Sequence, residues 1–306
     1  MTSPNGTTHA ALFASAVAAA QRKGIVVTDA SPPHSHTSIV NGLPLHYLDW
    51  SGAGTPPLVL LHGALLHAHV WDFFSLAMRT RFHIRAVDLP GHGETAWASD
   101  RDYSRARAAN DVATLIEQLD LRSLVLVGHS FGGAVSALVA ARLMERVRAL
   151  VMVDSTLLSS GRRSVRSQAA ELPQTFESFE EFAQHAAGLR RRPDPARPAT
   201  SLHWNARQLA DGQWTWKYDP ALRQAVLGPS DFQDIWSALG AFRGPVLFVR
   251  AGEHSHLADA AAERLQTLPN VRLVVVPAAA HNVMTDNPVA FVREVGDFLA
   301  ELAVPR

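Results

Sequence analysis

The chain has 306 residues, of which 47% are hydrophobic and 18% are charged, with 28 basic residues against 28 acidic ones. A chain of this length can bury a large apolar core, either as one large domain or as a core with an inserted subdomain. A net charge of zero argues against nucleic-acid binding, which depends on a basic surface. The absence of cysteine excludes disulfides, thiolate metal sites and a cysteine nucleophile.

The N-terminal region contains one apolar stretch, residues 10–20. Basic residues follow this stretch instead of preceding it, which is the reverse of a signal peptide. No apolar run approaches the roughly 20 residues that cross a bilayer. We therefore expect an N-terminal extension over residues 1–36 that contains a short helix, and a cytoplasmic protein that does not engage a membrane.

From residue 37 the chain alternates between strand-like and helix-like segments. Two short strands flank Asn41-Gly42, a pair that predicts a hairpin because both residues tolerate positive φ. Short apolar runs are typical of strands buried on both faces. Such runs occupy residues 57–61, 82–87, 123–127 and 148–153, and helical patterns separate them at 70–78, 103–119 and 131–144.

The alternation breaks over residues 155–242, which hold helical patterns and an Arg/Pro-rich stretch, and it resumes with two more strand–helix pairs. Buried strands that alternate with helices predict a mostly parallel sheet with helices on both faces, an α/β fold. We expect the core to comprise residues 37–154 and 243–306. Residues 155–242 are expected to form a helical lid over the carboxyl edge of the sheet, where open α/β folds bind ligands.

The sequence Gly128-His129-Ser130-Phe131-Gly132 lies between a predicted strand and a predicted helix. A sharp strand-to-helix turn strains its central residue, so small residues are needed two positions before and after it. Such a turn lifts the serine hydroxyl above the sheet and beside a helix N-terminus, whose dipole favours negative charge. This context predicts that Ser130 is a nucleophile.

With three further segments, this motif makes the chain resemble the α/β-hydrolase fold superfamily from about residue 37 to the C-terminus. The segments are Leu61-His62-Gly63-Ala64, Asp88-Leu89-Pro90-Gly91-His92-Gly93-Glu94, and Ala280-His281 ahead of Asp286-Asn287-Pro288. The resemblance implies the α/β-hydrolase fold with an inserted helical lid. Serine at position 130 argues against the dehalogenases and epoxide hydrolases of the superfamily, which use aspartate as the nucleophile.

The resemblance further implies an oxyanion hole made of the backbone amides of Ala64 and Phe131. Acyl transfer needs such donors, and removing one typically raises the barrier by about 3 kcal/mol. Gly63 permits the close backbone approach that this loop requires. His62 is expected to brace the loop rather than to transfer protons.

The base of the site is expected to be His281, which follows an apolar strand and precedes the last helix. The usual acid position of the family, three residues past a glycine in the preceding loop, is Ser255 here, and serine cannot carry the charge. Some family members place the acid after the strand that follows the nucleophile helix, and Asp154 stands there. Glu253 is the alternative acid; Asp259 and an incomplete triad also remain open.

Several tryptophans fit a cavity for apolar or aromatic ligands, although tryptophans in a lid also simply pack it onto the core. The candidates are Trp71, Trp97, Trp204, Trp214 and Trp216. Three His-x-His pairs, at 34/36, 67/69 and 254/256, lack a complementary carboxylate spacing, so no metal is expected. No phosphate-binding glycine motif is present, so no nucleotide cofactor is expected either.

The sequence therefore predicts a serine hydrolase that uses water to cleave a small or medium hydrophobic carboxylic ester or lactone through an acyl-enzyme. Because a fold does not fix the chemistry, two alternatives stay open. One is carbon–carbon bond hydrolysis or a cofactor-free lyase or oxygenase reaction, with the same serine and histidine transferring protons. The other is a ligand-binding protein with little turnover. Nothing in the sequence indicates an oligomeric state.

Overall fold

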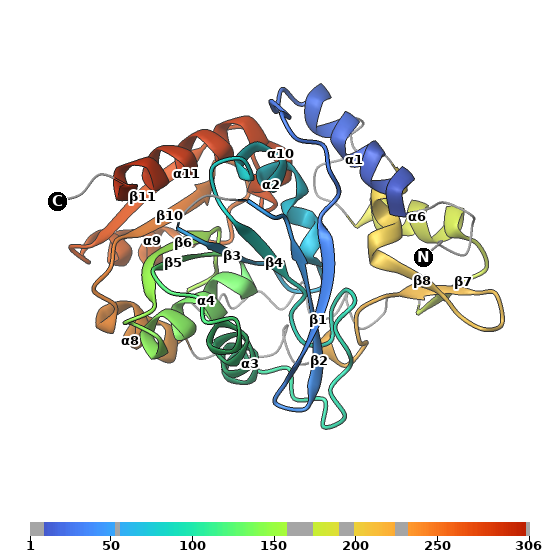
Figure 1. Cartoon of the computed structure of the whole chain (residues 1–306), viewed down its shortest axis with the longest axis horizontal. Helices are drawn as coiled ribbons and strands as arrows, with labels where there is room; N and C mark the ends of the chain where they lie inside the picture. Colours follow the sequence, from blue (N-terminus) through green and yellow to red (C-terminus); the bar gives the residue numbers. More distant parts are fainter. Residues whose placement is uncertain (1–8, 53–55, 158–173, 190–198, 224–231, 304–306) are drawn as a thin grey trace.

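The computed structural model describes residues 9–52, 56–157, 174–189, 199–223 and 232–303 (Figure 1). Its main feature is an eight-stranded sheet with the order β1-β2-β4-β3-β5-β6-β10-β11. The strands are β1 (His34–Val40), β2 (Leu43–Asp49), β3 (Leu58–Leu61), β4 (Ile84–Val87), β5 (Leu124–His129), β6 (Val147–Val153), β10 (Val246–Ala251) and β11 (Val271–Val276). Only β2 runs antiparallel to its neighbours, so the sheet is mostly parallel, as predicted.

The predicted hairpin is confirmed at the start of the sheet. Val40 pairs with Leu43 across the turn, and Asn41 and Gly42 both have positive φ, at 49° and 82°. A two-residue turn with this backbone matches the twist of the flanking strands. The turn therefore sets the register of β1 against β2.

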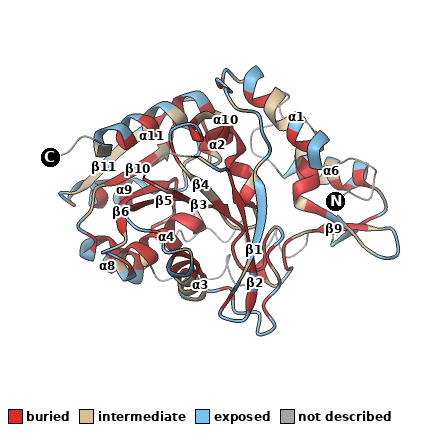
Figure 2. Cartoon of the chain, in the orientation of Figure 1, coloured by how far each residue is buried: buried red, intermediate tan, exposed pale blue. Residues whose placement is uncertain are grey.

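Helices cover both faces of the sheet, and buried residues gather between the layers (Figure 2). One face is covered by α1 (His9–Arg22), α2 (Asp72–Met78), α10 (Val283–Asp286) and α11 (Pro288–Ala303). The other is covered by α3 (Arg105–Gln118), α4 (Phe131–Arg142), α8 (Gln233–Ala241) and α9 (Asp259–Gln266). The central strands β3 and β5 are buried along their whole length, as their apolar runs predicted.

Residues 155–242, called the insertion below, join β6 to β10. Where the sequence predicted helices, the described part also contains a three-stranded antiparallel sheet in the order β7-β9-β8. The described elements of the insertion are β7 (Thr175–Phe176), α6 (Phe179–Gly188), the 3₁₀ helix η2 (Ala199–Asn205), β8 (Ala206–Gln208), β9 (Trp214–Trp216) and α8. Aromatic and β-branched residues favour strands, and all three residues of β9 are buried. The last helix, α8, packs against α4 and so belongs to the helical layer beside the sheet.

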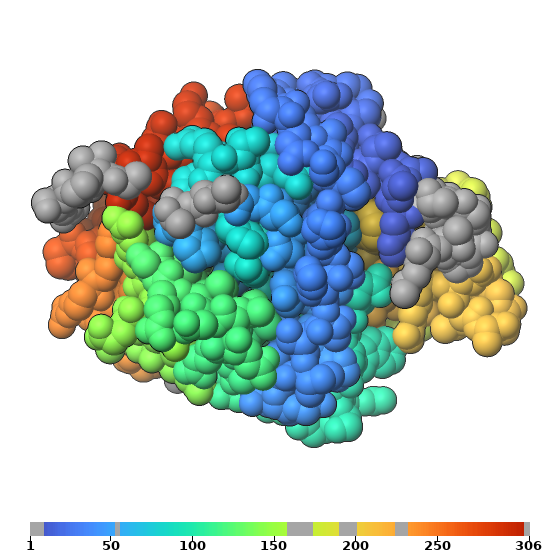
Figure 3. Space-filling view, viewed as in Figure 1, coloured from blue at the N-terminus to red at the C-terminus, as the bar shows by residue number. Residues whose placement is uncertain are grey.

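The helix expected in the N-terminal extension is α1. It packs against α2 of the core and against η2 of the insertion, and Figures 1 and 3 show it running from the upper edge of the core toward the insertion. Within the described ranges, no helix combines the length and the apolar character that crossing a bilayer requires.

Candidate active site

Ser130 lies at the sharp turn between β5 and α4, with φ of 51° and ψ of −114°. Positive φ is uncommon for a residue with a side chain and typically costs about 1–3 kcal/mol. The glycines around it are required sterically. A Cβ at Gly128 would lie 2.3 Å from the carbonyl oxygen of Gly132, and one at Gly132 would lie 2.4 Å from that of His62. Glycine at these two positions thus lets the turn close tightly against the loop after β3.

The structure brings Ser130, His281 and Asp154 together in one hydrogen-bonded chain. His281 Nε2 lies 3.1 Å from Ser130 Oγ, and His281 Nδ1 lies 2.8 Å from Asp154 Oδ2. Ser130 follows β5 and Asp154 follows β6, which are neighbouring parallel strands. Because parallel strands end at the same edge of a sheet, the side chains meet at its carboxyl edge.

Asp154 is fully buried, and its carboxylate accepts three hydrogen bonds besides that from His281. The donors are the amides of Ala251 and His256, at 3.1 and 3.0 Å, and the hydroxyl of Ser255. Burial acts to raise the pKa of Asp154, but the hydrogen bond and charge of His281 and the other donors outweigh it and hold the pKa below its usual value. Asp154 is therefore ionised at neutral pH.

An ionised Asp154 fixes the tautomer of His281. A carboxylate only accepts hydrogen bonds, so Nδ1 carries the hydrogen and Nε2 offers its lone pair to the hydroxyl of Ser130. His129 donates from Nε2 to the carbonyl oxygen of His281 at 2.8 Å. Burial, followed by the nearby His281, holds the pKa of His129 well below its usual value. His129 thus stays neutral and places no second cation beside His281.

The loop after β3 lies directly against the nucleophile. A Cβ at Gly63 would lie 3.2 Å from Ser130 Cβ and 2.6 Å from His129 Nδ1, which accounts for glycine there. In the described part of the chain, the backbone amides of Ala64 and Phe131 donate no hydrogen bond. Both residues are half-buried. Two unengaged amides beside Ser130, one of them at the N-terminus of α4, suit a developing negative charge.

His62 braces this loop from within. Its Nδ1 donates to the carbonyl oxygen of Gly63 at 2.8 Å, and its Nε2 accepts from the amide of Leu89 at 3.0 Å. Burial lowers the pKa of His62, so the ring is neutral, as this pair of bonds requires. The structure therefore places His62 in the bracing position that the sequence predicted.

His92 supports the same loop from the segment after β4, a function that the sequence did not predict. Its Nε2 accepts from the amide of Leu65 at 3.0 Å, and its Nδ1 donates to the carbonyl oxygen of Pro90 at 2.9 Å. Leu65 has a φ of 62°, so the bond holds a strained residue next to Ala64. Burial lowers the pKa of His92 to about 3, which keeps its acceptor nitrogen unprotonated.

A second Ser–His–Asp chain lies outside the candidate site. His46 Nδ1 lies 2.7 Å from Asp88 Oδ2, and His46 Nε2 lies 2.8 Å from Ser35 Oγ. Asp88 also accepts from the amides of Ala68 and Glu94, so it ties β2 to the segments after β3 and β4. Ser35 is exposed as the second residue of the edge strand β1, so it lies within a strand and not at a strand-to-helix turn.

The acid alternatives lie elsewhere in the loop between β10 and α9. Glu253 is exposed, and the Nδ1 position of His281 is occupied by Asp154. Asp259 is exposed at the start of α9 and pairs with Arg250. Ser255 stands at the usual acid position of the family and donates its hydroxyl to Asp154 instead.

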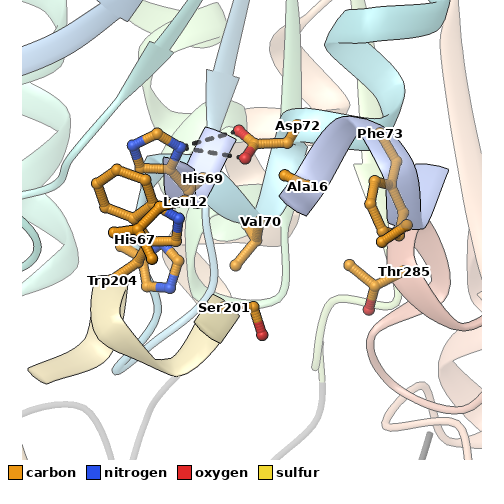
Figure 4. A pocket seen from close by; sticks show the side chains of 11 residues that line it. Leu12, Ala16, His67, His69, Val70, Asp72, Phe73, Ser201, Trp204 and Thr285 are labelled. Carbon is orange, nitrogen blue, oxygen red and sulfur yellow. Dashed lines mark hydrogen bonds and ion pairs between the residues drawn. The ribbon is translucent and has the colours of Figure 1, made fainter. Parts of the chain in front are cut away.

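Three of the candidate tryptophans lie in hydrophobic cores. Trp71 is fully buried under the sheet, and Trp214 and Trp216 pack with the aromatic rings of α6 inside the insertion. Trp97 is 37% exposed under the guanidinium of Arg207. Trp204 lines the pocket shown in Figure 4. The structure thus gives three of these rings a packing role, because aromatic residues are favoured in cores as well as in ligand sites.

His256 makes a further contact with His281 that the sequence did not predict. Its ring stacks on that of His281, with centroids 3.6 Å apart and planes at 21°. Its presence in a His-x-His pair was visible in the sequence, but stacking on a residue 25 positions away carries no local signal.

Comparisons with known proteins agree with this fold. The sequence model of the alpha/beta hydrolase family matches residues 58–294. The esterase Rv0045c of Mycobacterium tuberculosis is 29% identical over 81% of this chain and 84% of its own length. N-formylmaleamate deformylase of Pseudomonas putida is 30% identical over 85% of this chain and 94% of its own length. A solved structure of the M. tuberculosis esterase superposes with a TM-score of 0.77 and 27% identity, covering 95% of this chain and 98% of that one. The chain belongs to the alpha/beta hydrolase family. It is an enzyme with hydrolase activity.

Proposed function

We propose that the protein is a serine hydrolase that cleaves hydrophobic carboxylic esters through an acyl-enzyme. The observation that supports this most strongly is the chain from Ser130 through His281 to the buried, ionised Asp154. The relative named as an esterase, which matches most of the chain, supports an ester as the substrate class. Lactones, which are cyclic esters, fall within the same proposal.

In the first half of the reaction, Ser130 Oγ attacks the carbonyl carbon while its proton passes to His281 Nε2. Asp154 stabilises the imidazolium that forms. The amides of Ala64 and Phe131 donate to the oxyanion, each contributing about 3 kcal/mol to stabilisation of the transition state. The intermediate then collapses, and the alcohol leaves with the proton from His281.

In the second half, His281 takes a proton from water, and the resulting hydroxide attacks the acyl group on Ser130. The acid is released and Ser130 Oγ regains its proton from His281. We propose that the insertion acts as a lid in both halves. Two contacts support this: Trp204 stacks on His69 with centroids 3.6 Å apart, and Asn205 lies 3.2 Å from His67. Both join the insertion to the segment that follows the oxyanion loop.

The experiment that tests the nucleophile is intact-mass measurement after incubation with a small fluorophosphonate, followed by peptide mapping. Ser130 attack forms an O–P bond and expels fluoride, so one adduct on Ser130 is expected. Ser35 is an internal comparison, because it has a His–Asp pair but lies within a strand and not at a strand-to-helix turn. Labelling of Ser35 in preference to Ser130 would contradict the assignment.

Substrate class is tested with an aryl ester, a lactone and a β-diketone, each with the wild-type protein and with Ser130→Ala. We expect turnover of the ester or lactone by the wild type and none by the variant. Turnover confined to the β-diketone would replace ester hydrolysis with carbon–carbon bond cleavage. Phosphonylation of Ser130 without turnover of any of the three would leave the nucleophile assignment standing and overturn the substrate class.

A further inference from the structure

The imidazole of His281, the proposed base, has a second imidazole stacked on one of its faces. The ring centroids of His256 and His281 lie 3.6 Å apart, and the ring planes meet at 21°. That separation is ordinary van der Waals contact, which for carbon atoms lies at about 3.5–4.0 Å. His256 is exposed and His281 is half-buried, so an exposed ring covers one face of a half-buried one.

The backbone at position 256 is fastened to the same carboxylate as His281. The amide of His256 donates to Asp154 Oδ2 at 3.0 Å, and that oxygen also lies 2.8 Å from His281 Nδ1. On either side, Ser255 donates its hydroxyl to Asp154 Oδ1, and the buried Leu257 donates its amide to Ser255 Oγ at 3.0 Å. None of these bonds uses a side-chain atom of residue 256. They therefore hold this position beside His281 whichever side chain it carries.

The hydrogen bonds of His281 leave the tilt of its ring to other contacts. They engage the ring edge, from Nδ1 to Asp154 and from Nε2 to Ser130. The χ2 torsion of histidine is broad, without narrow staggered wells, so contacts on the ring faces help to decide how the plane is tilted. The ring of His129 also lies close, with centroids 4.6 Å apart, but its plane is inclined by 48°. Of these two rings, His256 is the nearly parallel one and opposes tilting more directly.

The proposed reaction makes this face contact more important. In the free enzyme, the hydroxyl of Ser130 donates to Nε2 and helps to direct the ring of His281. Once Ser130 Oγ is bonded to an acyl group, it has no hydrogen to donate, and Asp154 alone of these two partners still holds the ring edge. The stack of His256 involves neither the hydroxyl nor the acyl group, so acylation does not remove it.

We propose that His256 is a positioning residue whose ring holds the plane of His281. The stack keeps Nε2 directed at Ser130 in the free enzyme and at the attacking water in the acyl-enzyme. A flat ring at position 256 is required for this, and its proton is not. The inference rests on the proposed hydrolysis through an acyl-enzyme. Such alignment matters because a misplacement of about 1 Å can cost about a hundredfold in rate.

The test compares His256→Ala, which removes the stack, with His256→Phe, which keeps a flat ring. The matched control is His36→Ala, because His36 is also exposed and is stacked on Tyr47 with planes at 19°, but it lies in the edge strand β1. Steady-state kinetics are measured with p-nitrophenyl acetate, and thermal unfolding confirms that each variant is folded. We expect kcat and kcat/KM to fall about tenfold in His256→Ala. His256→Phe should regain most of that loss, and His36→Ala should match the wild type.

Equal losses in His256→Ala and His256→Phe would overturn the inference, because a flat ring would then not be what the base requires. Wild-type kinetics in His256→Ala would overturn it as well. The rate constant for phosphonylation of Ser130 by a fluorophosphonate gives a readout that needs His281 but no ester. A protein that cleaves no ester, but whose phosphonylation is slowed in His256→Ala and restored in His256→Phe, would retain the positioning role and reject the proposed function. Equal phosphonylation rates in the wild type and His256→Ala would reject the positioning role.

Discussion

Asp154 and Ser255 together occupy the place that a single acidic residue has in most family members. Asp154 accepts the hydrogen bond of His281, and Ser255 stands at the usual acid position. The carboxylate bonded to His281 follows β6, and the hydroxyl of Ser255 donates to it from the loop after β10. Those two strands are paired neighbours, with Val249 opposite Val153. A carboxylate after β6 can therefore reach the same histidine as a carboxylate in the loop after the neighbouring strand β10.

Replacing Asp154 by asparagine should lower kcat by about 10⁴, because the amide no longer imposes the hydrogen on Nδ1 of His281. The matched control is Glu253→Gln, which makes the same chemical change in the exposed alternative and should leave kcat unaffected. Steady-state kinetics with a p-nitrophenyl ester measure both. A mild effect of Asp154→Asn with a large effect of Glu253→Gln would move the acid to the later loop.

The loop after β3 is held in place by two histidines whose hydrogen bonds all go to backbone groups. His62 secures its start and His92 secures Leu65, and both need a neutral ring to do so. Each nitrogen of each ring makes one hydrogen bond. The geometry of the loop therefore depends on side chains outside the hydrogen-bonded chain of Ser130, His281 and Asp154.

His92→Ala should lower kcat by roughly ten- to a hundredfold with a smaller change in KM. The Leu65 amide would lose its buried acceptor, which costs about 1–3 kcal/mol of stability. The neighbouring Ala64 amide would then no longer be oriented toward the oxyanion. The comparison is His83→Ala. This variant removes a half-exposed histidine that directly precedes β4 and is bonded to Asp49. An equal fall in thermal stability for both variants with no difference in kcat would show that His92 is structural only.

Sequence patterns predicted those features that depend on neighbours in the chain. The hairpin at Asn41-Gly42 and the turn at Ser130 follow from local backbone chemistry, and the buried strands follow from their apolar runs. The sequence also singled out Asp154, although only through the family resemblance. The small sheet of the insertion was missed because its strands have two or three residues, too few to show alternation. The stack of His256 on His281 and the bond from His92 join distant segments, for which spacing gives no signal.

For the molecule as a whole, buried neutral histidines make stability depend on pH. The pKa values of His62, His92 and His129 are all lowered by burial, that of His92 to about 3. The unfolded chain therefore binds more protons than the folded one below about pH 6.5. The stability that these groups support is fully present above that pH and is lost as the pH falls toward their folded pKa values.

The free energy of unfolding should thus decrease between pH 7 and pH 4.5. His92 alone accounts for roughly 3 kcal/mol, at about 1.4 kcal/mol for each pH unit below 6.5. The pKa values of Asp88 and Asp154 are lowered below the usual value of 3.8, so their contributions are lost only at still lower pH. Urea titrations at several pH values measure the decrease; an unchanged midpoint down to pH 4.5 would contradict it.

The positive φ of Ser130 is shared by Asp154, at 44°, so two of the three residues of the site occupy backbone conformations that glycine adopts more easily. Neither can be glycine without losing its chemistry. A search for stabilising substitutions, by chance or by design, would therefore be drawn toward the residues on which activity depends. Selection for thermal stability alone would favour replacing residues that activity requires. Any such selection therefore has to keep Ser130 and Asp154 unchanged.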